Sequence, residues 1–184
     1  MAKVLVISGH PDLEASVANK AILDAFQKAE GLDIEIREVN TGIFDVSAEQ
    51  MALLEADIVV WQFPFFWYAL PSGMKAWVDN VFTYGFAFGA GGDRLWGKKL
   101  ILSFTTGAPM KEYAIDGAMN YEIAAFIPPL RQTALYCGMS FEEPIITTGM
   151  HYIPGLSTEA DRESIKARAR MHSERLAKLC RSFG

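Results

Sequence analysis

Apolar positions along the chain follow two patterns: short runs, and longer segments with helical spacing. The runs are rich in β-branched residues and predict strands at 3–8, 33–39, 57–63 and 99–104, with a fifth near 144–147. Helical spacing predicts a helix from the N-cap Ser16 to Gly31, and others at 47–55, from Pro71, at 119–131 and at 157–181. Pro128-Pro129 is expected to disturb the end of the fourth helix.

Strands that alternate with helices are typical of an α/β protein with helices on both faces of a parallel sheet. Five strands in 184 residues predict a three-layer sandwich with the flavodoxin-like strand order 2-1-3-4-5, and residues 1–184 are expected to form a single domain. In this architecture ligands bind beyond the carboxyl ends of the strands, at the switch point. The chemistry is therefore expected in the loops after the first, third and fourth strands.

Composition and charge narrow the possible partners and the compartment. The net charge of −5 has the wrong sign for a sequence-independent nucleic-acid binder. Residues 157–184 alone carry seven basic and four acidic side chains. This local excess of positive charge indicates either a solvated helix face or a basic docking surface. Without a secretory signal, and with only Cys137 and Cys180, we expect a cytoplasmic protein with reduced thiols, although a disulfide between them stays open. A peripheral position at the inner face of the cell membrane is a further alternative.

The loop after the first strand, SGHPDLEASVAN at 8–19, has polar groups suited to an anion. It lacks the glycine spacing of dinucleotide and nucleoside-triphosphate loops, so ATP and GTP chemistry is not expected. A helix N-terminus with free amides, together with His10, the Ser16 hydroxyl and the Asn19 amide, can hold a phosphomonoester without a formal cation. A competing interpretation is a zinc-dependent N-deacetylase that uses His10 and Asp12, but Leu13 replaces the second aspartate of its motif.

Half of the aromatic residues lie in one short window. The chain has 22 aromatic residues, and 11 of them fall within 61–88. Trp61, Phe63 and Trp77 are expected in the core. Four consecutive aromatic side chains in a loop cannot all face one core, so some are expected to stack on a planar ring system or to form a homodimer contact: Phe65, Phe66, Trp67 and Tyr68.

The loop after the fourth strand supplies the third part of the predicted site. It reads Thr105-Thr106-Gly107-Ala108, in which two hydroxyls and a glycine suit the polar edge of a ring. A plain strand-to-loop turn is an equally good interpretation of this segment alone. The prediction of a binding site rests on the convergence of three loops on one edge of the sheet.

Six segments together resemble a known family: GHP at 9–11, SVAN at 16–19, FPFFWYALP at 63–71, KAWVDNVFTYGFAFG at 75–89, TTG at 105–107 and LYCG at 135–138. On them the chain resembles the NAD(P)H:quinone oxidoreductases of flavodoxin-like fold. It is most similar to their short bacterial branch, which includes the ancillary oxidoreductases of glutathione-gated potassium efflux systems.

The resemblance implies a flavin, FMN or FAD, with NAD(P)H as co-substrate and a quinone or similar electron acceptor. The length of 184 residues favours FMN. The residues implied around the phosphate are His10, Ser16, Val17, Ala18 and Asn19, and those around the isoalloxazine are Phe65, Phe66, Trp67, Tyr68, Thr105, Thr106, Gly107 and Ala108.

The resemblance also implies a homodimer, and a regulatory flavoprotein that activates a membrane potassium-efflux protein is the alternative role. Tyr84 and Phe86, with Phe88, are candidates for the substrate pocket or the dimer contact. The amides of Thr106 and Gly107 are expected to stabilise negative charge on the reduced ring, and Tyr113 is the candidate catalytic residue.

Two positions depart from the family pattern. Ala108-Pro109 follows Gly107 where many members have a second glycine, so one backbone donor and some flexibility can differ. Asp116 lies near the position at which larger members have a histidine, and a carboxylate cannot donate a proton as imidazolium does.

Overall fold

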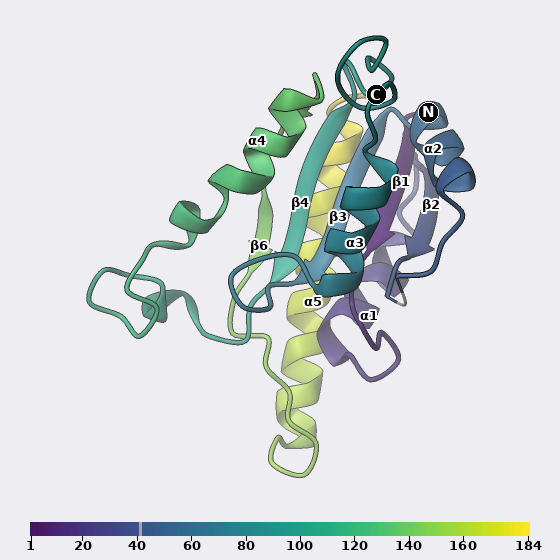
Figure 1. The fold of residues 1–184 in the computed structure, drawn as a ribbon. Coiled ribbons are helices and arrows are strands. Elements are labelled where there is room, and N and C mark those ends of the chain that lie inside the picture. The colour runs from purple at the N-terminus through teal and green to yellow at the C-terminus, as the bar shows by residue number, and fades with distance from the viewer. Residues whose placement is uncertain (41) are drawn as a thin grey trace.

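The computed structural model describes residues 1–40 and 42–184, with a parallel β-sheet at the centre (Figure 1). The strands run in the order β2-β1-β3-β4-β5, and β6 also pairs with β4. Their bounds are β1 Lys3–Ser8, β2 Asp33–Glu38, β3 Ile58–Pro64, β4 Lys99–Thr105, β5 Ser140–Phe141 and β6 Ile145–Thr147. This order confirms the predicted α/β flavodoxin-like topology.

Helices cover both faces of the sheet, which makes the predicted three layers (Figure 1). The helices α1 and α5 pack on one face and on each other, and α2, α3 and α4 cover the opposite face. Their bounds are α1 Val17–Phe26, α2 Val46–Glu55, α3 Ser72–Val81, α4 Pro128–Tyr136 and α5 Glu159–Arg181, with short 3-10 turns η1 Met110–Glu112 and η2 Ile123–Phe126. In the part of the chain that the structure describes, no helix has the length and apolar character needed to cross a bilayer.

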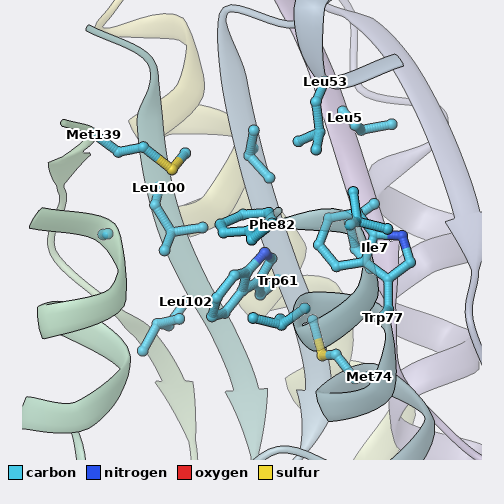
Figure 2. Packing of buried hydrophobic residues seen from close by; sticks show 14 of the residues in the cluster. Leu5, Ile7, Leu53, Trp61, Met74, Trp77, Phe82, Leu100, Leu102 and Met139 are labelled. Atoms are coloured by element: carbon cyan, nitrogen blue, oxygen red, sulfur yellow. The ribbon is translucent and has the colours of Figure 1, made fainter. Parts of the chain in front are cut away.

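The core on the α3 face is built around large aromatic side chains (Figure 2). Trp61 of β3 and Trp77 of α3 are fully buried, as is Phe63, which confirms their predicted role. Within the described residues the indole N–H of Trp61 has no hydrogen-bond partner. It lies beside the Phe82 ring, with centroids 6.1 Å apart, so the ring face offers it only a weak acceptor.

Three local predictions differ from the structure. Helix α1 ends at Phe26 instead of near Gly31, which lies in the turn before β2 with a φ of 80°. The predicted helix at 119–131 is wrong, because Pro128-Pro129 begins α4 instead of interrupting a helix. The first helical positions need no N–H partner, so proline is favoured there. The fifth strand is divided into β5 and β6, which pair with opposite halves of β4.

Candidate functional site

A cleft of about 270 Å³ lies at the carboxyl edge of the sheet, where the predicted loops meet. Its lining comes from the loops after β1, β3, β4 and β6: His10, Ala15, Ser16, Val17, Ala18, Asn19, Pro64, Phe65, Phe66, Thr105, Thr106, Gly107, Met150, His151 and Tyr152. Ten of the predicted cofactor residues are in this set, while Trp67, Tyr68 and Ala108 are outside it. Among these lining residues there is no lysine or arginine.

The N-terminus of α1 presents amide donors to the cleft. The Ser16 hydroxyl caps the helix and accepts from the Asn19 amide at 3.1 Å. Among the described residues no hydrogen bond occupies the amides of Val17 and Ala18. Two backbone donors at the positive end of the helix therefore remain for an anion.

His10 adds a side-chain donor to the same cleft. Its Nδ1 accepts from the Asp12 amide at 3.1 Å, which places the proton of the neutral ring on Nε2. Partial burial lowers the pKa of His10, against the opposing effect of Asp12, and so favours the neutral ring. The ring stands edge-on to Phe66, with centroids 6.1 Å apart.

The loop after β4 is held by the neighbouring strand β6. The Thr106 amide donates to the Thr147 carbonyl at 3.1 Å, so the prediction that this amide stabilises a reduced ring is wrong. The Gly107 amide makes no hydrogen bond to the described residues and is left as the donor of this loop. Thr105 and Thr106 are buried, and the Thr106 hydroxyl donates to the Ala108 carbonyl at 2.7 Å.

The aromatic loop after β3 divides between core and surface. Phe65 is buried against Phe104, with ring centroids 4.9 Å apart. Phe66 is exposed at the cleft, and Trp67 is 91% exposed. Trp67 and Tyr68 have φ values of 49° and 64°, a left-handed conformation that costs energy for large side chains. Two consecutive strained and exposed aromatic residues are typical of a binding surface.

The other predicted residues are outside the lining of the cleft. Tyr113 is buried, and burial raises its pKa against the opposing effect of a hydrogen bond with Thr106. Tyr84 is 68% exposed, whereas Phe86 is 9% exposed and packs in the core, which leaves little of its surface for a substrate. Asp116 is exposed.

Three lining residues come from a loop that the sequence analysis did not assign to the site: Met150, His151 and Tyr152. They follow β6, and His151 lies against Gly107, where an added Cβ atom would be 3.7 Å from its ring. The sequence could have predicted this loop as part of the site, because the end of the predicted strand near 144–147 also belongs to the carboxyl edge of the sheet.

The zinc alternative receives no support from the described residues. They contain no group of three or more His, Cys, Asp or Glu side chains arranged to hold a metal ion. Asp12 instead accepts a hydrogen bond from the Ala15 amide. Cys137 and Cys180 are both free and buried.

Fold and cleft together define an α/β protein with an anion-accepting edge at the switch point of its sheet. A family model for the flavodoxin-like fold matches residues 2–173, and the chain belongs to this family.

Two relatives and a solved structure each resemble three quarters or more of the chain. The uncharacterized NAD(P)H oxidoreductase YrkL of Bacillus subtilis is 40% identical over 141 residues, 76% of this chain and 81% of that protein. The glutathione-regulated potassium-efflux system ancillary protein KefF of Enterobacter sp. is 36% identical over 175 residues, 94% of each chain. The crystal structure of general stress protein 14 from Treponema denticola, in complex with FMN, has a TM-score of 0.83 at 29% identity and covers 98% of this chain and 99% of that one.

Proposed function

We propose that this chain is a flavin-dependent NAD(P)H:quinone oxidoreductase that uses FMN. One observation carries the proposal: free helix amides and a strained aromatic loop border the same cleft. Phosphate and isoalloxazine are the two ends of FMN, and they require these two kinds of surface. The FMN complex of the solved relative and the oxidoreductase name of the Bacillus relative support it.

The donor set fits a phosphate that is bound without a cation. The Val17 and Ala18 amides, the Ser16 hydroxyl and the Nε2–H of His10 border one end of the cleft. Charge-assisted hydrogen bonds from such neutral donors are about twice as strong as neutral pairs. We assign the phosphate of the cofactor to this end.

The size of the cleft divides the cofactor between its interior and its rim. About 270 Å³ is slightly less than the smallest usual pocket for a whole ligand, roughly 300 Å³. The cleft therefore suits the phosphate and its polyol arm, and the ring would lie at the rim, between Phe66 or Trp67 and the Gly107 amide. A ring held there would keep one face open, at which NAD(P)H and then a quinone would bind in turn.

A bound flavin supplies the hydride-accepting and hydride-donating centre of a ping-pong reaction. The chain itself supplies positions and donors. The Gly107 amide stabilises negative charge at the ring edge. Burial raises the pKa of Tyr113, so this residue keeps its proton on Oη at neutral pH and can hold it near Thr106.

A homodimer would cover the aromatic surface that one copy of the chain leaves exposed. Trp67, in the loop after β3, and Tyr84, in the loop between α3 and β4, are both large and exposed. Exposed aromatic residues of this kind are enriched in interfaces. We propose that residues 1–184 form one flavin-binding domain in the cytoplasm that pairs with a second copy at this surface.

The test is an absorption spectrum of the purified protein, followed by release and identification of the cofactor. We expect a flavin spectrum, FMN on release, and oxidation of NAD(P)H when a quinone is added. Trp67→Ala is expected to weaken flavin retention, and Trp96→Ala, an exposed tryptophan at the opposite edge of the sheet, is the matched control. A colourless protein that binds neither FMN nor FAD would refute the proposal.

A regulatory role is the second candidate, in which the flavoprotein activates a membrane potassium-efflux protein. The similarity to KefF and the excess of basic side chains at 157–184 favour it. Efflux is measured in cells that lack the protein and in cells that carry a catalytically inactive variant. Restored efflux control in the second strain is expected for a regulator, and no effect of the deletion would contradict this role.

A further inference from the structure

Buried polar side chains connect the outer surface of α5 to the phosphate end of the cleft. Going inward, the hydrogen bonds join Arg175, Thr147, His172, Ser103, Gln62 and Asn19. Asn19 finally reaches Ser16 and Thr105 at 3.3 and 3.2 Å. The inner members of this chain of bonds, here called the relay, are almost completely shielded from solvent.

The direction of the bonds at His172 follows from Ser103, whose one hydrogen goes to Gln62 Oε1, so that its oxygen can only accept from Nε2 of the ring. A guanidinium can only donate, so Thr147 Oγ1 accepts from Arg175 at 2.7 Å. The Thr147 hydroxyl then donates to Nδ1 of His172 at 2.8 Å, which leaves the proton of the neutral ring on Nε2. Nε2 in turn donates to the Ser103 hydroxyl at 2.7 Å.

The same direction continues across the sheet to the helix. Ser103 donates to Gln62 Oε1 at 2.5 Å, and Gln62 Nε2 donates to Asn19 Oδ1 at 2.9 Å. The Asn19 amide group is therefore oriented with its nitrogen toward Ser16 and Thr105. The Ser16 oxygen accepts from both Asn19 nitrogens, so its hydrogen is free to point into the cleft, whereas the Thr105 hydroxyl also reaches Asn19 Oδ1 at 3.5 Å.

We propose that the relay from Arg175 through His172 to Asn19 positions the Ser16 hydroxyl as a donor to the cofactor phosphate. This proposal rests on the proposed function, because it takes the anion of the cleft to be the phosphate of FMN. The relay explains how a site with no lysine or arginine in its lining can face an anion with hydrogens only. His172 and Ser103 act through other residues and are positioning residues.

A break in the relay removes the orientation without removing a group from the cleft. Without the Ser103 hydroxyl, Gln62 loses the donor that holds its oxygen, and both Gln62 and Asn19 can turn over. A turned Asn19 presents its oxygen to Ser16, whose hydroxyl then donates to Asn19 and not to the anion. The loss is expected at the phosphate, because neither the Gly107 amide nor Phe66, at the ring end of the cleft, is bonded to Asn19 in the described structure.

The experiment compares the affinity for FMN with that for riboflavin, which lacks the phosphate. Ser103→Ala is expected to weaken FMN binding about tenfold and to leave riboflavin binding within about twofold. Ser173→Ala removes the same hydroxyl from a buried serine of α5 outside the relay, and it is expected to change neither affinity. His172→Gln keeps one donor and one acceptor and is expected to retain FMN affinity within about threefold, whereas His172→Leu loses about tenfold.

Two results overturn the relay: equal FMN affinity in Ser103→Ala and Ser173→Ala, or an equal loss of FMN and riboflavin in the relay variants. If Ser103→Ala does not fold, the His172→Gln and His172→Leu pair makes the same comparison. Inorganic phosphate, titrated against the amide signals of residues 16–18 by NMR, separates this proposal from the proposed function. A wild-type protein that binds phosphate but no flavin refutes only the function, and one that binds neither refutes both.

Discussion

The buried imidazole of His172 is expected to make the stability of the chain depend on pH. Its side chain is completely shielded, and burial, with a smaller effect of the Arg175 charge, lowers its pKa from 6.5 to about 3. The perturbation is His172→Gln, which removes the titration and keeps a donor for Ser103 and an acceptor for Thr147.

The sign and the size follow from proton binding in the two states. Between the unfolded pKa of 6.5 and the folded pKa of about 3, the unfolded chain binds a proton that the folded chain does not. The unfolded state is therefore favoured as the pH falls, by about 1.4 kcal/mol per pH unit within this window. From about pH 7.5 to about pH 5 the free energy of unfolding is expected to fall by about 2 kcal/mol on account of His172 alone.

The assay is urea unfolding of both proteins at the two pH values, followed by tryptophan fluorescence. The fall in the free energy of unfolding is expected to be about 2 kcal/mol larger for the wild type than for His172→Gln. Titration of His10 and of the carboxylates is common to both proteins and cancels in this difference. If the two proteins lose equal stability, His172 is not held neutral by burial, and the direction assigned to the relay is wrong as well.

Three further changes test the core, the backbone and the chemistry. Trp61→Ala is expected to lower the free energy of unfolding by about 3–5 kcal/mol, because its indole is fully buried, while the exposed Trp67→Ala changes it by less than about 0.5 kcal/mol; similar urea midpoints would contradict this. Gly73→Ala brings a Cβ atom within 2.6 Å of the Val39 carbonyl oxygen and is expected to cost about 1–3 kcal/mol in thermal unfolding, whereas an unchanged melting temperature would show that the backbone yields. Tyr113→Phe is expected to slow quinone reduction about 100-fold in stopped-flow assays with little change in FMN affinity, and an unchanged rate would exclude a catalytic role.

The fold could be predicted because its signals are local. Each long strand is an apolar run, such as β3, and each helix shows an apolar stripe or a cap, such as Ser16 before α1. The predicted helix bounds are wrong where one residue type is compatible with two opposite local structures. Pro128 can end one helix or begin the next, and only the packing of α4 beside β5 decides between them.

Only those parts of the site whose residues are consecutive in the sequence could be predicted. The loop at 16–19 and the loop at 105–107 carry their chemistry in adjacent residues, and both line the cleft. The relay could not be read in this way, because Gln62 and Ser103 are single polar residues within apolar strands. Strand register places them as partners, and His172 reaches them only through the packing of α5 on the sheet.

An anion site without a cation has to obtain its selectivity from donor orientation, and orientation must be established when the chain folds. A lysine in the cleft would attract any anion and would lose part of that attraction to solvent and salt. A hydroxyl that is turned by a buried relay meets the anion already oriented, so binding does not have to order it. The energetic cost of this orientation falls instead on the folded state, in which His172 stays neutral at pH values far below its ordinary pKa. On this argument the loss of stability in acid and the affinity for a phosphate have one structural origin, the burial of an imidazole between two hydroxyls.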